Sequence, residues 1–270
     1  MISRINRSAA KLFCVMAGAL VLTGAVGVQS AFAQQARKSE RYMITVVTVK
    51  PEMVEEYENF VKTETNPALM KGGVKWRDAW KTAMFGNSFE YIYVQSAENM
   101  ADFDGAGPIE KALGKEGNNA WNAKSRKFLT SVRRMAIMTR PDLSYDGPNP
   151  GAWAPAVAVV THTTVAPNRN AELEAFIKND FLPVMKQAKV PGFLVSQVAL
   201  GGNPNEYVSL VLHANMAELE KGPPVYRVMS KEAGDKLLQK VPAGVIIKQE
   251  RYVSRYSPEL SFRPAPTAAK

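Results

Sequence analysis

The sequence predicts an α+β protein that contains two tandem copies of one β-α-β-β-α-β unit. The 270-residue chain aligns with itself over about seventy residues, without a gap, when Pro51 is placed on Pro167. Each copy has the same order of strand-like and helix-like segments. The composition, with 46% hydrophobic and 22% charged residues, is that of a globular protein. Because the offset between the copies exceeds the period of solenoid repeats, the pattern indicates a duplicated domain.

The first 33 residues have the three parts of a secretory signal peptide. Arg4, Arg7 and Lys11 form a basic head, an apolar run extends from Leu12 to Val28, and Ala31-Phe32-Ala33 precedes a polar residue. This pattern is typical of cleavage after Ala33, whereas a retained membrane anchor would need a run of ~20 apolar residues. We therefore expect export, to the periplasm or out of the cell, and no membrane contact once the signal peptide is removed.

The charge and the reactive residue types exclude several classes of function. Loss of residues 1–33 removes three basic residues and no acid, so the formal net charge falls by three, from +9 to +6. A charge of this size is typical of a solvated surface, and we expect no nucleic-acid partner. The remaining chain has no cysteine and two histidines, which excludes disulfides, thiol nucleophiles and Cys/His metal clusters.

The correspondence between the two copies extends to individual residues. Pairs at one constant offset include Glu56 with Glu172, Phe60 with Phe176, Pro67 with Pro183, Gly86-Asn87 with Gly202-Asn203, Glu90-Tyr91 with Glu206-Tyr207, and Asn99 with Asn215. After one inserted residue, Pro141-Asp-Leu-Ser-Tyr145 aligns with Pro258-Glu-Leu-Ser-Phe262. Chance does not maintain one offset over such a length, so both copies should have the same fold.

Each copy opens with a strand rich in Val and Thr, at residues 42–49 and 156–165. The next segment is a helix that starts at Pro51 or Pro167, a residue suited to a first helical turn, and its apolar residues recur every three or four positions. A Gly-Asn turn then joins the second and third strands as a hairpin, and a partly irregular helical region precedes the last strand. The ranges are 74–85 and 193–200 for the second strands, 89–95 and 206–213 for the third, 98–130 and 214–240 for the helical regions, and 134–140 and 245–255 for the last strands.

The boundaries of the predicted domains follow from these elements. The signal peptide covers 1–33, the first repeat 34–145 and the second repeat 154–262. Between the repeats, residues 146–153 form a turn-rich linker. The tail, residues 263–270, is rich in proline and alanine, and we expect it to be disordered.

The order β-α-β-β-α-β is that of a ferredoxin-like unit. One such sheet carries helices on one face and leaves the other bare and apolar, so the sheets of two copies can pack face to face as an α+β barrel. On this element order and the Gly-Asn hairpins, residues 41–145 and 154–262 resemble the dimeric α+β barrel superfamily, and are similar to antibiotic-biosynthesis-monooxygenase-like and NIPSNAP-like domains. The resemblance implies a small-molecule partner and no cofactor, and it leaves open whether the protein forms a homo-oligomer.

Strand alternation predicts which side chains face the space between the sheets. In the third strands, the wholly apolar face that includes Ile92 and Val208 is assigned to the helices. The other face, which should line the barrel, carries four candidate site residues: Tyr91, Tyr93, Tyr207 and His213. The same reasoning directs His162 into the barrel. We interpret His162 and Tyr91 as catalytic, with the histidine as a general base; the alternative is that the histidines only satisfy hydrogen bonds in the core or at the rim.

The second strand of the first copy differs most from its counterpart. Trp76, Asp78 and Trp80 share one face, whereas the matching positions in the second copy are Gly192, Leu194 and Ser196. Two indoles beside a carboxylate could hold a flat organic ligand and orient one polar group of it. The alternative is that these aromatic residues only fill the barrel.

Three functions from different classes fit this sequence. The first is an exported protein that binds a small, partly aromatic molecule in an inter-sheet cavity, as a cofactor-independent monooxygenase-like enzyme. The second is a haem protein similar to the chlorite-dismutase-like group, with a histidine as axial ligand. The third is a non-catalytic assembly module. The chain has no nucleophile-elbow, zinc-protease, P-loop or dinucleotide motif, and we expect no metal site.

Overall fold

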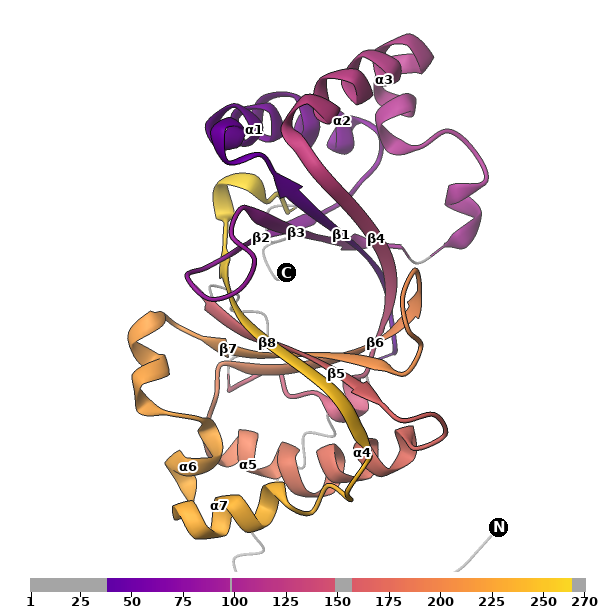
Figure 1. Ribbon diagram of the computed structural model, residues 1–270. Coiled ribbons are helices and arrows are strands. Elements are labelled where there is room, and N and C mark those ends of the chain that lie inside the picture. The colour runs from indigo at the N-terminus through magenta and orange to yellow at the C-terminus, as the bar shows by residue number, and fades with distance from the viewer. Residues whose placement is uncertain (1–37, 98, 149–156, 264–270) are drawn as a thin grey trace, which may run out of the picture. The chain divides into compact units, whose positions relative to one another are not determined.

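Eight antiparallel strands close into a barrel in the computed structural model, which describes residues 38–97, 99–148 and 157–263 (Figure 1). The strands are β1 (Arg41–Val49), β2 (Arg77–Thr82), β3 (Glu90–Ser96), β4 (Leu129–Thr139), β5 (Val157–Val165), β6 (Gly192–Leu200), β7 (Glu206–His213) and β8 (Ile246–Tyr256). Their order around the barrel is β1-β3-β2-β8-β5-β7-β6-β4, with β4 paired to β1. Each repeat therefore supplies one ferredoxin-like sheet, which confirms the predicted fold class.

The two sheets join at both edges. At one junction β2 pairs with β8, and Trp80 lies opposite Tyr256. At the other junction β4 pairs with β6, and Ile137 lies opposite Val198. Each junction thus connects the second strand of one repeat to the last strand of the other. These are the edge strands of the two sheets, so each edge strand pairs with an edge strand of the other repeat.

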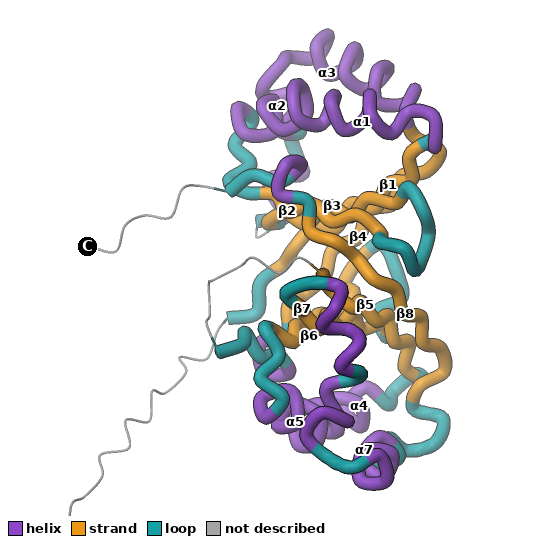
Figure 2. The backbone as a smooth tube through the Cα atoms, turned by 90° about the vertical axis from the view of Figure 1, so that its left-hand side faces the viewer, coloured by secondary structure: helices purple, strands orange, loops and turns teal. Residues whose placement is uncertain are grey.

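Helices cover the outside of each sheet, so the strands lie between two helical layers (Figure 2). In the first repeat these are η1 (Pro51–Met53), α1 (Val54–Phe60), η2 (Val61–Thr65), α2 (Asn66–Lys71), η3 (Met100–Phe103) and α3 (Pro108–Phe128). In the second repeat they are α4 (Asn170–Phe176), η5 (Ile177–Phe181), α5 (Leu182–Gln187), η6 (Met216–Lys221), α6 (Pro224–Val228) and α7 (Lys231–Leu238). Two short 3₁₀ turns follow the last strands, η4 (Pro141–Leu143) and η7 (Pro258–Leu260).

Both first helices contain a π turn at the same place in the repeat. The π turns η2 and η5 lie immediately before the helix turns that contain Pro67 and Pro183. A proline inside an α-helix lacks an amide hydrogen, and its ring collides with the carbonyl four residues earlier. The wider π turn relieves that collision, and the amide of Asn66 accordingly bonds to the carbonyl of Val61, five residues back. The equivalent prolines Pro67 and Pro183 thus produce a π turn at the same place in both repeats.

The short turns that follow the last strands cross to the opposite repeat. Leu143 follows β4 of the first repeat, yet it is 1% exposed in the apolar core beneath the second repeat's helices. Leu260 follows β8 and is 0% exposed in the core of the first repeat. Backbone bridges anchor both arms, between Tyr145 and Phe193 and between Phe262 and Arg77. We call residues 141–145 and 258–262 the crossed arms.

Some predictions fall on residues that the structure does not describe, and others need correction. The signal peptide, residues 149–153 of the linker and residues 264–270 of the tail lie outside the described residues. The second strand of the first copy is shorter than predicted, because residues 74–76 precede the strand and residues 83–89 form the hairpin loop. The last strand β4 is longer, and begins directly after α3. Within the described part of the chain, no helix has the length and hydropathy needed to span a membrane.

Candidate functional site

The inner face of the barrel carries a cluster of apolar side chains at its centre. Ile92, Val94, Val208, Leu210 and Leu212 line the interior together with Ala158 and Val160. The predicted orientation of the third strands is therefore wrong: Tyr91, Tyr93 and Tyr207 face the helices. Along β1, β3, β5 and β7 no side chain is exposed on either face. The helix side holds the polar tyrosine hydroxyls because helical carboxylates can reach them there.

His162 does lie on the inner face, as predicted. In the β5 register it is opposite Val208 of β7 and Glu250 of β8, and so shares their face. Its Nδ1 is 2.6 Å from Glu206 Oε1 and its Nε2 is 3.1 Å from the Tyr252 hydroxyl. The side chains of His162 and Glu206 are only 23% and 14% exposed. The geometry is that of a carboxylate–imidazole–phenol relay.

Tyr252 gives this group its connection to the barrel interior. Its ring stacks on the His162 ring at 5.6 Å and packs against the cluster that contains Trp80 and Val160. Burial, and then the negative charges of Glu90 and Glu206, raise the pKa of Tyr252. The hydroxyl therefore stays protonated and is a hydrogen-bond donor.

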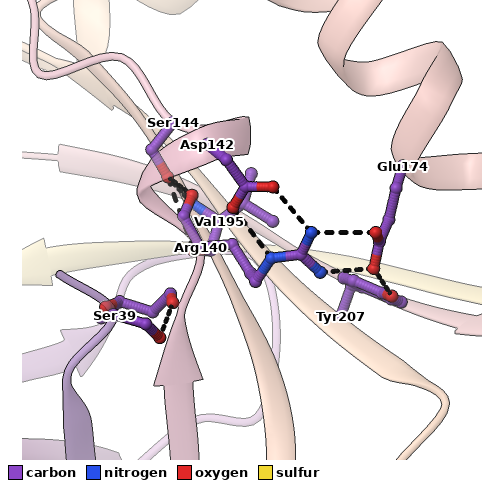
Figure 3. A network of polar contacts seen from close by, with 8 residues as sticks. Ser39, Arg140, Asp142, Ser144, Glu174, Val195 and Tyr207 are labelled. Carbon is purple, nitrogen blue, oxygen red and sulfur yellow. Dashed lines mark hydrogen bonds and ion pairs between the residues drawn. The ribbon is translucent and has the colours of Figure 1, made fainter. Parts of the chain in front are cut away.

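Tyr207 belongs to an ion-pair network between sheet and helix (Figure 3). Its hydroxyl donates to Glu174 at 2.5 Å, and the same carboxylate binds the guanidinium of Arg140, which also contacts Asp142 in a crossed arm. Hydrogen bonding to Arg140 lowers the pKa of Glu174, so the network is charged. Tyr207 thereby helps to fix an arm of the other repeat.

Tyr91 has the matching role in the first repeat. Its hydroxyl donates to Glu58 at 2.7 Å. Lys81 joins Glu58, at 2.7 Å, to Glu259 of the second crossed arm, at 3.1 Å. Burial, followed by the hydrogen bond to Glu58, raises the pKa of Tyr91. The predicted catalytic role for Tyr91 requires a tyrosine in the barrel, and the structure places it outside.

Tyr93 lies deeper on the same outer face. Its hydroxyl is 2.8 Å from that of Tyr57, and the guanidinium of Arg77 covers its ring at 3.6 Å. Arg77 also donates to Asn66, whose amide reaches the carbonyl of Leu260. Burial raises the pKa of Tyr93 to about 12. These contacts hold the second crossed arm, and Tyr93 is remote from the barrel lining.

His213 also lies outside the barrel, in contrast to the prediction. It pairs with Val157, on the helix-facing side of β5, and its side chain is 3% exposed. Burial lowers the pKa of His213 to about 4, and the nearby positive charge of Arg227 acts in the same direction. His213 is thus a neutral imidazole packed between sheet and helix.

Trp76, Asp78 and Trp80 lie at or near the inner face, at the β2–β8 junction. Asp78 and Trp80 are opposite Val94 and Ile92. Trp80 contacts the ring of Tyr256 at 5.2 Å and joins the apolar cluster beside Tyr252. The barrel lining therefore brings Trp80 and the His162 group into one connected cluster, with Asp78 at the far side of Trp80.

Sequence reasoning missed the two residues that complete the His162 group. Glu206 was visible as the counterpart of Glu90, but its strand was assigned the wrong face. Tyr252 lies in the last strand, and its register with Val160 is set only by the β5–β8 pairing. The alternation of β8, with Glu250, Tyr252, Ser254 and Tyr256 on one face, was the signal that could have found it.

The described histidines do not fit an axial haem ligand as they are packed. His162 has a partner at each ring nitrogen, so an iron bond would displace Glu206 or Tyr252. His213 is 3% exposed, so a macrocycle could reach it only if neighbouring side chains moved. Among the residues with described positions, no group of three or more His, Cys, Asp or Glu side chains could hold a metal ion.

The eight-stranded barrel with its two outer helical layers defines the class of protein: an α+β barrel of the dimeric type, here within one chain. Neither a protein-family model nor a curated protein matches this sequence. Solved structures do match it over about four fifths of the chain, and they share the predicted α+β barrel fold.

Three of these structures illustrate the range of proteins with this fold. A protein provisionally named a monooxygenase, from Fusobacterium nucleatum subsp. nucleatum, is 13% identical with a TM-score of 0.55, covering 80% of this chain and 91% of its own. An anthrone oxidase-like protein is 14% identical with a TM-score of 0.52, over 82% and 93%. A mutant chlorite dismutase from Candidatus Nitrospira defluvii is 10% identical with a TM-score of 0.53, over 83% and 93%. At such identities the likeness is one of fold.

Proposed function

We propose that the protein binds a small, partly aromatic molecule on the inner face of its barrel and oxidises it with dioxygen, as a cofactor-independent monooxygenase-like enzyme. The observation that carries this proposal is the group of Glu206, His162 and Tyr252 on the barrel lining. The fold is shared with an anthrone oxidase-like protein and with proteins provisionally named monooxygenases, which supports the same chemistry.

The three side chains suit proton abstraction from an activated carbon or a phenol. When substrate binds, the Tyr252 hydroxyl turns from His162 Nε2 to the substrate, which frees Nε2 to take the substrate proton. Glu206 stabilises the imidazolium that forms, because it accepts the hydrogen bond from Nδ1 at 2.6 Å. Tyr252 remains protonated at neutral pH and donates a hydrogen bond to the oxyanion of the substrate. The resulting carbanion reacts with dioxygen: one oxygen atom enters the product as a carbonyl and the other leaves as water.

The surroundings of this group suit an aromatic substrate. Trp80 and Tyr252 belong to one apolar cluster with Val160 and Leu212. Aromatic rings in such a cluster contact a flat ligand over a large area and in defined geometries. The lining thus separates an apolar binding surface from a polar end where the reacting oxygen is recognised.

Oxygen uptake with anthrone as the substrate tests the proposal. We expect the purified protein to consume dioxygen and form anthraquinone, and His162→Ala to lower the rate by about 10²-fold or more. Tyr252→Phe should lower the rate to a smaller extent, since only the oxyanion donor is lost. Arg251→Ala is the matched control, because Arg251 is the neighbouring residue of β8, is exposed, and points away from the lining.

Three outcomes would contradict the proposal in different ways. Turnover that is unchanged in a folded His162→Ala variant would remove the base from the mechanism. Binding of anthrone without oxygen uptake, seen as quenching of tryptophan fluorescence, would favour a non-catalytic binding protein. An absorption band near 400 nm in the purified protein would favour the haem alternative.

We also propose that the protein acts after export, with cleavage between Ala33 and Gln34. The basic head, the apolar run and the Ala-x-Ala sequence of residues 1–33 support this location.

A further inference from the structure

Asp78 is a carboxylate buried at the β2–β8 junction, distant from the proton-transfer group. Its side chain is 7% exposed and shares the inner face with Val94 and Trp80. A buried carboxylate is costly unless a cation compensates it. The buried carboxylate of Asp78 therefore needs a cation beside it.

The compensating cation is Arg263, the residue that follows the second crossed arm. Its Nε is 2.8 Å from Asp78 Oδ1, and a second guanidinium nitrogen contacts Oδ2, so the pair is bidentate. The Tyr256 hydroxyl donates to the same Oδ1 at 3.4 Å. Whereas Asp78 is nearly covered, the Arg263 side chain is 46% exposed.

Aromatic rings complete the surroundings of the guanidinium. Arg263 lies 5.2 Å from the centre of the Trp76 ring. The Trp76 ring is itself fixed by an edge contact with Tyr42 at 5.3 Å, and Tyr256 is fixed by Trp80 at 5.2 Å. A buried carboxylate beside preorganised aromatic faces is the arrangement by which proteins recognise organic cations.

The fold does not require this arrangement. The equivalent junction in the second repeat has Gly192, Leu194 and Ser196 in place of Trp76, Asp78 and Trp80, and the barrel closes there as well. The position equivalent to Arg263 after the first arm is Asp146. The Asp78–Arg263 pair is thus present at the β2–β8 junction and has no counterpart at the β4–β6 junction.

We propose that Asp78, Trp76 and Tyr256 form a binding site for an organic cation, a guanidinium or a substituted ammonium, which Arg263 occupies in the free protein. The arm can release Arg263 without unfolding. Phe262 is fixed by two backbone hydrogen bonds to Arg77, at 2.8 and 2.9 Å, and Leu260 is buried. Because the Arg263 side chain is half-exposed, an external cation can reach the pair and take its place, and the buried carboxylate of Asp78 then stays compensated throughout the exchange.

Titration with benzyltrimethylammonium, followed by tryptophan fluorescence and calorimetry, tests the site. We expect weak binding to the wild type and at least tenfold tighter binding to Arg263→Ala, because the competing side chain is gone. Adding Asp78→Asn to that variant should abolish binding. Arg255→Ala, which removes an exposed arginine from the outer face of β8, should bind as the wild type does.

These binding measurements test the cation site independently of the oxidase proposal, since no turnover is measured. Absence of binding to a folded Arg263→Ala variant would overturn the inference, as would binding that survives Asp78→Asn. If Arg263→Ala does not fold, the wild type decides: binding that is lost in Trp76→Ala supports the site, and no binding to the wild type overturns it.

Discussion

The imidazole of His213 is neutral because of where its side chain is packed. It is 3% exposed between β7 and the helical layer, and burial lowers its pKa to about 4 from an ordinary 6.5. Between these two pH values the unfolded chain binds a proton that the folded chain does not. The contribution of His213 to stability is therefore complete above pH 6.5 and is lost as the pH falls toward 4.

We expect the titration of His213 to account for part of the stability that the protein loses at low pH. On lowering the pH from 6.5 to 4, the free energy of unfolding of the wild type should fall by up to about 3 kcal/mol more than that of His213→Gln. Denaturant unfolding at several pH values measures the difference. Parallel pH profiles for the two proteins would show that His213 is not the group responsible.

Single residues could be grouped from the sequence but not oriented. Alternation established that Tyr91 and Tyr93 share a face, and that His162 and Val160 share another. It did not establish which face is inner, because β3, β5 and β7 have no exposed side chain on either face, so the usual contrast between a polar and an apolar face is absent. The orientation of the strands is seen only in the tertiary structure, where Glu58 and Glu174 of the helices accept hydrogen bonds from the hydroxyls of Tyr91 and Tyr207.

At the scale of elements, the crossed arms link the two repeats in addition to the two strand junctions. Each arm inserts one leucine into the core of the other repeat, and each is fixed by a tyrosine–carboxylate–cation network. The Pro-x-Leu-Ser-aromatic sequence was recognised as a repeated motif, but its destination was not predictable. A short segment after a strand can dock on its own sheet or on the next one, and the sequence of the segment is compatible with both.

The arms predict where core substitutions will be costly. Leu143→Ala and Leu260→Ala should each lower the free energy of unfolding by about 2–5 kcal/mol, because each leaves a cavity in a closed core. Ile247→Ala, at a side chain that is 61% exposed, is the control and should have a much smaller effect. Chemical denaturation measures all three. A small loss for both leucines would mean that the arms are not needed for the cores.

For the molecule as a whole, the barrel can close only when two repeats are present. One repeat alone leaves the apolar inner face of four strands open, together with the β2 and β4 edges that pair across the junctions. It also lacks the leucine that fills its core from the partner arm. These exposed surfaces favour association of two copies.

Expression of residues 34–148 alone tests this dependence. We expect a homodimer in which each copy supplies the missing sheet and arm to the other, or an aggregate if the arms fail to exchange. Light scattering after size exclusion measures the mass. A soluble monomer as resistant to denaturant as the full chain would show that the repeats are independent.

The sequence by itself determined the duplication, the order of the elements and the closure of two ferredoxin-like sheets into a barrel. These follow from local periodicity and from one offset that the two copies maintain over about seventy aligned positions. Tertiary structure alone decided that the tyrosines face the helices, that Glu206 and Tyr252 join His162, and that Arg263 neutralises Asp78. Such contacts depend on strand pairing and arm docking between residues far apart in the chain, whose energies no local pattern encodes.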